Sequence, residues 1–262
     1  MKLPLYWVDA FTKDRFHGNP AGVVVSEEAL VPELMQSIAA ENNIAETAFV
    51  VPAGTGFAIR WFTPTVEVDL CGHATLASAF ALGLHGLIKS NHIEFISASG
   101  PLAVSRDGER LALDFPARPA REAREAPMIA EVSNALGAVP SEVHQAVAIM
   151  AVFDTEEKLR SLRPDMDAVL RLPCYGLVAT APGNGCDFVS RFFAPKVGVP
   201  EDPVTGSTHC TLIPYWSARL GKTKLYAKQL SPRGGELWCE DRKGRVQIAG
   251  HCALYMRGEI DR

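Results

Sequence analysis

The stretch RWFTPTVEV at residues 60–68 returns in altered form as RFFAPKVGV at residues 191–199. The second copy begins 131 residues after the first (191 minus 60), which is half of the 262-residue chain. An internal repeat is the sequence signature of duplicated structural units. The two copies therefore predict two similar domains, one in each half of the chain.

The segments around the two copies predict the elements of each domain. Before each copy, an apolar stretch is broken by a Gly-x-Gly turn, at residues 49–56 and 177–185, which is typical of a β-hairpin. After each copy comes a run typical of a helix, at residues 72–83 and 206–221, whose terminal Gly83 or Gly221 fits a left-handed C-cap. A helix that is apolar nearly all round must be buried. We therefore predict an α+β fold of two pseudo-symmetric domains, in each of which a curved β-sheet wraps a central helix.

The segment between the halves, PARPAREAR at residues 116–124, is rich in proline and charge, as linkers are. It places the N-terminal domain at residues 1–117 and the C-terminal domain at residues 125–262. Beyond it, residues 129–136 predict a short amphipathic helix and residues 246–256 predict a final strand. The sequence leaves open whether that strand closes the second domain or returns to the first.

Composition and charge narrow the possible functions. Hydrophobic residues make up 47% of the chain and charged residues 21%, which is typical of a globular protein. The net charge of −4 offers no basic surface for a phosphate backbone, so a small molecule is a better candidate partner than nucleic acid. The N-terminal residues lack a signal-peptide pattern and no apolar run reaches membrane-spanning length. We therefore expect a cytoplasmic protein that does not bind membranes.

Several familiar site motifs are missing from the sequence. The six cysteines are scattered, without a Cys-x-x-Cys pair or a Cys/His cluster at zinc spacing, so we expect neither disulfides nor a metal site. There is no Gly-x-Gly-x-x-Gly after a strand, no phosphate-binding P-loop and no Gly-x-Ser-x-Gly elbow. We therefore expect no cofactor.

The starts of the two central helices are candidate parts of a ligand site. A pseudo-twofold pair of domains brings equivalent elements face to face, so we expect both helix starts in one cleft between the domains. Helix N-termini favour an anionic ligand such as a carboxylate. His73 and Ser207 occupy equivalent positions, one residue after Gly72 and Gly206. Capping is a sufficient explanation for Ser207, whereas His73 is suited to donate a hydrogen bond or transfer a proton.

Two carboxylates are candidates for acid/base chemistry. Glu46 begins an apolar strand, where burial would raise its pKa towards the operating pH, as a general acid/base needs. The simpler alternative is an edge-strand glutamate that faces water. Asp202 stands before Pro203, four residues ahead of the second helix, where a turn aspartate is the alternative.

Cys71 invites a thiol mechanism, because a helix N-terminus lowers the pKa of a thiol. Its partner in the repeat is Thr205, so a racemase with one thiol on each face of the substrate lacks its second cysteine. Cys71 and His73 are two residues apart, and helix residues at that separation do not face one another. We therefore expect no local thiol–imidazole pair and interpret Cys71 as a structural residue.

Six segments in five ordered motifs carry a resemblance that spans nearly the whole chain. They are VDAFT (8–12) with GNPAGV (18–23), AETAF (45–49), DLCGHAT (69–75), EDPVTGS (201–207) and QLSPRGG (229–235). In these the chain resembles the phenazine-biosynthesis isomerase-like family, which shares its fold with diaminopimelate epimerase. The resemblance implies two barrel-like domains around central helices, an active site between them, and commonly a homodimer.

The resemblance also implies site residues and a reaction. The acid/base glutamate of the family falls on Glu46, and its other site residues fall on His73, Asp202 and Ser207, with Gly72 beside them. In the phenazine enzyme the reaction is isomerisation of 2,3-dihydro-3-hydroxyanthranilate without a cofactor. The N–H groups near Gly72 and Gly206 would then bind the substrate carboxylate.

These expectations combine into one hypothesis with two rivals. The hypothesis is a cofactor-independent isomerase that relocates a proton on a small, cyclic carboxylate substrate, with Glu46, His73 and Asp202 as catalytic residues. One rival is an amino-acid racemase or epimerase on the same fold, which the pairing of Cys71 with Thr205 disfavours. The other is a catalytically silent small-molecule binding protein. The substrate does not follow from the fold.

Overall fold

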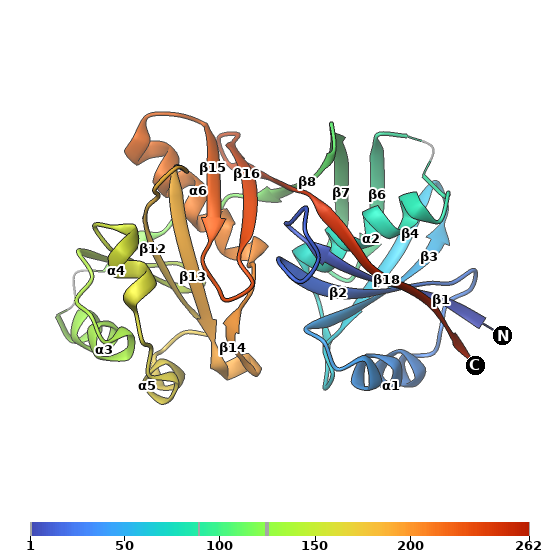
Figure 1. Cartoon of the computed structure of the whole chain (residues 1–262), viewed down its shortest axis with the longest axis horizontal. Helices are drawn as coiled ribbons and strands as arrows, with labels where there is room; N and C mark the ends of the chain where they lie inside the picture. The colour runs from blue at the N-terminus through green and yellow to red at the C-terminus, as the bar shows by residue number, and fades with distance from the viewer. Residues whose placement is uncertain (1, 89, 124–125, 262) are drawn as a thin grey trace. The chain divides into compact units, whose positions relative to one another are not determined.

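The computed structural model describes residues 2–88, 90–123 and 126–261, which form two compact units (Figure 1). Unit 1 consists of Met1–Asp114 and Ala249–Arg262, and unit 2 of Phe115–Ile248. Within the expected linker, residues 116–123 are described and include the short strand β9 (Arg121–Glu122). Residue 124 and the expected start of the second domain at residue 125 lie outside the described residues.

Unit 1 is built from one run of hydrogen-bonded strands and two helices. The strands are β1 (Lys2–Ala10), β2 (Asn19–Val25), β3 (Glu46–Ala53), β4 (Gly56–Phe62), β5 (Glu67–Val68), β6 (His92–Ser97), β7 (Gly100–Asp107), β8 (Arg110–Pro116) and β18 (Cys252–Asp261), and the helices are α1 (Pro32–Asn42) and α2 (Gly72–Leu84). The strands pair in the order β18-β1-β2-β3-β4-β6-β7-β8, with β5 also on β4. Only the β2/β3 and β4/β6 pairs among these are parallel.

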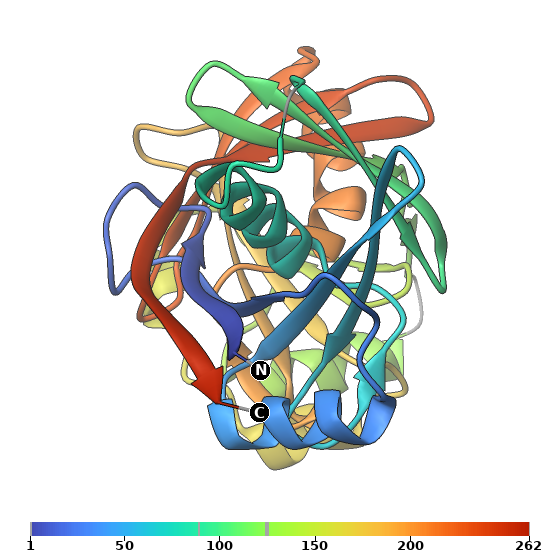
Figure 2. The same ribbon diagram turned by 90° about the vertical axis from the view of Figure 1, so that its right-hand side faces the viewer.

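Helix α2 is the centre of unit 1, and Figure 2 shows strands around it. It packs against β1, β2 and β3. Nine of its thirteen residues are buried, because small and apolar side chains cover nearly its whole circumference. The expected central helix inside a curved sheet is confirmed.

Unit 2 repeats this plan with further helices. Its strands are β9, β10 (Glu142–Gln145), β11 (Ile149–Val152), β12 (Leu177–Pro182), β13 (Phe188–Ala194), β14 (Val199–Asp202), β15 (Lys224–Gln229), β16 (Gly235–Asp241) and β17 (Arg245–Gly250), and its helices are α3 (Ala126–Leu136), α4 (Glu156–Ser161), α5 (Met166–Arg171), α6 (Gly206–Leu220) and the 3-10 turn η1 (Pro195–Val197). Strand β13 pairs antiparallel with β12 and parallel with β15, as β4 pairs with β3 and β6. Helix α6 lies between β14 and β15 in the chain, as α2 lies between β5 and β6.

The repeated arginines make equivalent contacts in the two units. The guanidinium of Arg60 binds both carboxylate oxygens of Glu67 at 2.7 Å. The guanidinium of Arg191 binds both oxygens of Glu201 at 2.8 and 3.0 Å. In unit 2 the acidic partner comes three residues later than the repeat alignment would place it, and η1 lies in between. The internal repeat therefore corresponds to duplicated structure, and each unit contains one copy of the same bidentate ion pair.

The ends of the central helices differ from one another. Gly221 has a φ of 66° and ends α6 as the expected left-handed C-cap. The same expectation for Gly83 is wrong, because α2 continues to Leu84. Gly86, with a φ of 81°, takes the left-handed position instead, and the Gly86 and Leu87 N–H groups bond the carbonyls of Gly83 and Leu82. This is a Schellman ending placed three residues further on.

The C-terminal segment forms two strands rather than one. The expected strand at residues 246–256 is divided at His251 into β17 and β18. β18 pairs antiparallel with β1 over its whole length, so the last strand belongs to unit 1.

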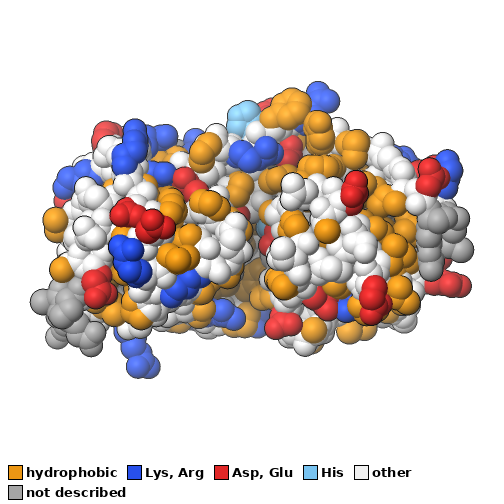
Figure 3. Space-filling view, turned by 90° about the horizontal axis from the view of Figure 1, so that it is seen from below, with side chains coloured by type: hydrophobic (Ala, Val, Ile, Leu, Met, Phe, Trp, Pro, Cys, Tyr) orange, Lys and Arg blue, Asp and Glu red, His pale blue; other side chains and the backbone are white. Residues whose placement is uncertain are grey.

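Among the described helices, none has the length and apolar character needed to cross a bilayer. On the face shown in Figure 3, acidic and basic side chains are interspersed.

Candidate active site

Glu46 is the first residue of β3, in unit 1. It lies beside Ala21 of the parallel strand β2, and its side chain is 20% exposed. The following residues, Thr47 to Val50, are buried, so the carboxylate stands where the strand enters the core. The carboxylate is therefore neither on an open edge nor fully enclosed.

The start of α2 brings two more side chains to Glu46. His73 is the second residue of α2 and is buried, and its Nε2 lies 3.1 Å from Oε2 of Glu46. Cys71 is the N-cap, and its Sγ lies 3.5 Å from Nδ1 of His73. The expectation of no thiol–imidazole pair is therefore wrong. Cys71 has extended backbone angles (φ −141°, ψ 109°), so the rule for neighbours within a helix does not apply to it.

The electrostatics of this cluster favour a charged imidazole beside a neutral thiol. Burial and the charge of Glu46 raise the pKa of Cys71, so the thiol stays protonated. Burial alone would lower the pKa of His73, but Cys71 and Glu46 raise it well above its usual value. Of these two groups, Cys71 has the larger effect on the pKa of His73 and Glu46 the smaller.

One oxygen of Glu46 is buried against His73. Oε2 is buried and makes no hydrogen bond of good geometry within the described chain, although His73 is at ion-pair distance. A buried carboxylate oxygen without a hydrogen bond costs free energy and is uncommon in native proteins. The group that this oxygen faces is the imidazole of His73.

The same three side chains have the spacing of a metal site. The ligand atoms of Glu46, Cys71 and His73 lie within 4.8 Å of one another. Carboxylate, thiolate and imidazole all bind zinc, but it is the thiolate rather than the thiol that does so. The raised pKa of Cys71 opposes that form. The absence of a metal therefore stays a prediction.

In unit 2, Asp202 ends β14 and is held in a network of polar side chains. The hydroxyl of Thr205 donates to Oδ2 of Asp202 at 2.5 Å. The amide of Gln229 donates to the backbone carbonyl of Asp202 at 2.8 Å and to Oγ1 of Thr205 at 3.1 Å. The side-chain oxygen of Gln229 accepts a hydrogen bond from the N–H of Thr205 at 2.9 Å.

Gln229 is a residue that reasoning from single side chains missed. It is buried, and three hydrogen bonds tie it to the turn between β14 and α6. The sequence signal that could have pointed to Gln229 is the QLSPRGG segment at residues 229–235. This segment belongs to the family resemblance, but no role was assigned to its residues. Gln229 fixes the turn that carries Asp202.

The start of α6 is equivalent to the start of α2. Its N-cap is Thr205, in the place of Cys71, and neither N-cap uses its side chain as a cap. Ser207 is the second residue of α6, as His73 is of α2, and it is exposed, so capping does not explain it. Gly206 and Gly72 are the first residues of their helices, as expected.

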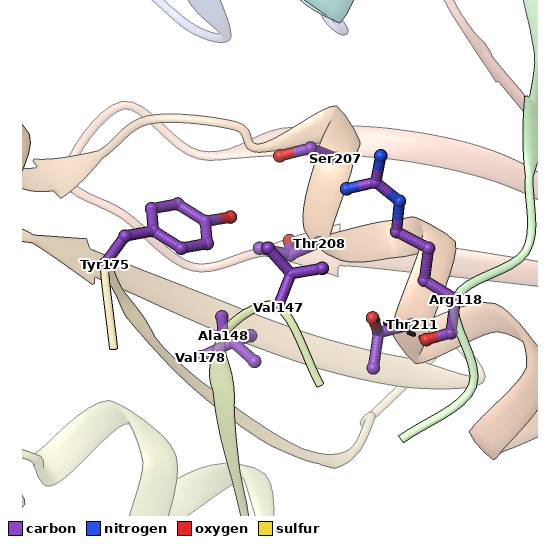
Figure 4. A pocket seen from close by; sticks show the side chains of 8 residues that line it. All are labelled: Arg118, Val147, Ala148, Tyr175, Val178, Ser207, Thr208 and Thr211. Atoms are coloured by element: carbon purple, nitrogen blue, oxygen red, sulfur yellow. Dashed lines mark hydrogen bonds between the residues drawn. The ribbon is translucent and has the colours of Figure 1, made fainter. Parts of the chain in front are cut away.

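A hollow beside Ser207 contains two polar side chains that sequence reasoning did not select. It is small, with a cavity volume of about 10 Å³, which is room for about one water molecule. Figure 4 shows Arg118 and Tyr175 extending towards the first turn of α6. Burial raises the pKa of Tyr175, and the charge of Asp202 raises it further. The hydrogen bond with Ser207 and the charge of Arg118 lower it. Tyr175 therefore lies within electrostatic reach of both predicted residues of unit 2.

Solved structures of other proteins show the same two-unit fold. A hydroxyproline epimerase of Agrobacterium vitis has a solved structure with a TM-score of 0.63 and 11% identity to this chain, covering 99% of this chain and 92% of that chain. At that identity the likeness shows the fold alone. The chain has the epimerase-like α+β fold that its repeat predicts.

The sequence defines the family. The model of the family described as "Phenazine biosynthesis-like protein" matches residues 8–258, and the chain belongs to that family. It is 51% identical over 261 residues to an uncharacterized isomerase of Pseudomonas aeruginosa, with 99% of each chain covered. A crystal structure of a PhzF-family phenazine biosynthesis protein of Enterococcus faecalis has 45% identity and a TM-score of 0.97, covering all of both chains. These relationships support an isomerase- or epimerase-type function.

Proposed function

We propose that the protein is a cofactor-independent isomerase that moves a proton on a small, cyclic carboxylate substrate by general acid/base catalysis. The observation that supports this most is the pair formed by Glu46 and His73, with 3.1 Å between Oε2 and Nε2. A carboxylate next to an imidazolium provides a base and an acid in one place.

The proposed reaction uses the two groups in sequence. The Glu46 carboxylate removes a proton from a substrate carbon, and the electron pair left behind is delocalised into the adjacent unsaturated system. The imidazolium of His73 stabilises the negative charge that develops there. Protonated Glu46 then returns the proton to a different carbon, so the enzyme ends in its starting state.

We propose that the residues of unit 2 contribute to substrate binding. Asp202 is suited to accept a hydrogen bond from an amino or hydroxyl group, and the Thr205 and Gln229 contacts keep it in place. The helix-start N–H groups near Gly72 and Gly206, with the hydroxyl of Ser207, are suited to a carboxylate. We further propose that the enzyme acts in the cytoplasm and that it is a homodimer, as the family resemblance implies. Light scattering tests the homodimer by a mass of twice 28.4 kDa.

The racemase alternative finds less support. A two-thiol mechanism needs a second cysteine at the N-cap of α6, and that residue is Thr205, whose hydroxyl is bonded to Asp202. The thiol of Cys71 is also kept protonated by burial and by the charge of Glu46. The proposed base is therefore the carboxylate.

The experiment is proton NMR of the protein in heavy water with 2,3-dihydro-3-hydroxyanthranilate and a panel of cyclic and amino carboxylates. We expect isomerisation or deuterium incorporation that Glu46→Gln reduces about 10²- to 10⁴-fold. Glu41→Gln, on the exposed side of α1, is the matched control and should retain activity. Addition of a chelator should leave the rate unchanged. Full activity in Glu46→Gln would overturn the mechanism, and tight binding without exchange would favour a silent binding protein.

A further inference from the structure

Unit 1 contains a cavity beside the C-terminal end of α2. The cavity is partly enclosed and has a volume of about 360 Å³. Its walls come from the start of β1, the end of β2 with the loop that follows it, Pro52 of β3 and the turn after α2. All of these residues belong to unit 1. Ligand pockets begin at about 300 Å³, so the space is sufficient for a small organic molecule.

Most of the lining is apolar. Pro4, Pro52 and Leu87 present apolar surface that is not buried, and the nearly buried side chains of Val25 and Leu30 form the rest of the apolar lining. Leu30 also belongs to the apolar cluster under α1, so this part of the wall is fixed by the core. The apolar body of a ligand would remove this surface from water, which is favourable.

The ring of His85 is a fixed part of the lining. Its Nδ1 lies 2.7 Å from the hydroxyl oxygen of Tyr6, whose side chain is completely buried. His85 is also the C-cap of α2, and its N–H donates to the carbonyl of Ala81 at 2.8 Å. The cavity therefore has a well-ordered polar edge, which lies about one helix length, ~20 Å, from His73 at the start of α2.

The charges around the cavity favour a cationic ligand. Glu27 and Glu28 line it and are exposed, and neither forms an ion pair within the part of the chain that the structure describes. Lys2 lines it as well, but its ammonium group is bound to the carboxylate of Glu259 at 2.8 Å. The C-terminal end of a helix adds partial negative charge. An amine therefore suits the polar side of this cavity better than a carboxylate does.

We propose that the cavity at the end of α2 is a second ligand site, which binds a small molecule with an apolar body and a protonated amine. The apolar body lies against Pro4, Pro52 and Leu87, and the amine faces Glu27 and Glu28. This site is separate from the pair formed by the carboxylate and the imidazole at the start of α2, and it does not depend on the proposed reaction.

The test uses phenethylamine as the probe, with phenethyl alcohol as its neutral analogue and 3-phenylpropanoate as its anionic one. Binding is measured by NMR titration of the full chain with labelled leucine and valine methyl groups. We expect phenethylamine to shift the signals of Val25, Leu30 and Leu87. We also expect it to bind about threefold to tenfold more tightly than the alcohol, because exposed charge pairs contribute modestly. The propanoate should bind more weakly than the alcohol.

One pair of variants locates the apolar part of the site. Leu87→Ala should weaken the binding of phenethylamine about threefold or more, because it removes apolar contact with the probe. Leu84→Ala is the matched control, since Leu84 is exposed to a similar extent at the same end of α2 and does not line the cavity. The control should bind phenethylamine as the parent does.

A second pair of variants tests the charge preference. The double substitution Glu27→Gln and Glu28→Gln should reduce the preference for phenethylamine over phenethyl alcohol to about twofold or less. The control, Glu41→Gln with Glu94→Gln, removes the same charge from exposed positions outside the lining and should keep the preference.

The outcomes separate this inference from the proposed reaction. Equal affinity for phenethylamine in Leu87→Ala and Leu84→Ala would overturn the site, as would a titration that leaves the Val25 and Leu30 signals unmoved. Equal binding of the three probes would overturn the preference for a cation. None of these results depends on whether Glu46→Gln loses activity, so the second site and the proposed reaction can fail independently.

Discussion

Nε2 of His73 lies 3.1 Å from Oε2 of Glu46, and the two groups reach one another from the second residue of a buried helix and the first residue of a strand. Neither side chain can move far, because both elements are anchored in the core of unit 1. The pair is therefore a fixed acid/base arrangement rather than a flexible surface contact. The protonation states of Glu46 and His73 decide which of the two groups acts as the base and which as the acid.

The first prediction concerns the titration of His73. Burial opposes the imidazolium and the neighbouring groups favour it, with the net effect that its pKa is well above the usual value. The imidazolium therefore persists through neutral pH and is lost only as pH rises through the raised pKa. Glu46→Gln removes one of the two groups that raise the pKa of His73, the other being Cys71, so this pKa should fall below that in the parent. NMR titration of labelled histidine measures this, with Glu41→Gln as control, and an unchanged His73 pKa would contradict the ion pair.

The second prediction concerns Cys71. Its raised pKa and burial keep it a protonated thiol, so we expect Cys71→Ser to retain activity within about tenfold of the parent. We also expect slow alkylation by iodoacetamide at neutral pH, because the thiolate is the reactive form. Initial rates and mass spectrometry measure these two effects. A loss of several orders of magnitude in Cys71→Ser would instead restore the thiol mechanism.

The third prediction concerns Gln229. Gln229→Ala removes three hydrogen bonds from a buried position and leaves the N–H of Thr205 without its acceptor. We expect a loss of about 2 kcal/mol or more in the free energy of unfolding, measured by urea denaturation. The control Gln145→Ala, at an exposed strand end, should change it by less than about 0.5 kcal/mol. Equal effects of the two substitutions would show that Gln229 does not hold the turn.

The fourth prediction concerns pH and stability. Burial lowers the pKa of His209 to about 4, so the folded protein keeps it neutral while the unfolded chain protonates it below its usual value of 6.5. The unfolded state then binds more protons between these values, and stability is lost as pH falls through that window. The loss amounts to about 3 kcal/mol by pH 4. His209→Gln should remove this part of the pH dependence, whereas His92→Gln, at an exposed position, should keep it.

The fold was predictable because its determinants are local. The hairpins around Gly54 and Gly183, the buried helix after residue 72 and the repeated RxF motifs follow from hydrophobic pattern and turn residues, and the structure contains all of them. The end of α2 was misplaced because two glycines, Gly83 and Gly86, are both compatible with a left-handed cap. Only the hydrogen bonds of the folded helix distinguish them.

The site was predictable only in part. Glu46 and His73 are brought together as hypothesised, but the contact of Cys71 with His73 depends on the extended backbone of an N-cap residue. Arg118 and Tyr175 are distant in sequence from Ser207, and nothing in their local pattern indicates that they share a hollow with it. Positions of this kind are set by tertiary packing, which a single sequence does not encode in any local motif.

Pro214, inside α6, makes the exchange of one amide proton sensitive to a local contact. Because Pro214 leaves the Cys210 carbonyl without a helical donor, that carbonyl accepts a hydrogen bond from the N–H of Arg118 at 2.8 Å. The amide proton of Arg118 is protected from solvent exchange only while the N-terminal segment of unit 2 is docked on that helix. Its exchange rate therefore follows the docking of this segment by itself, separately from global unfolding. One amide signal would thus report whether a ligand, a substitution or a change of conditions tightens or loosens the wall of the hollow, without any label being added.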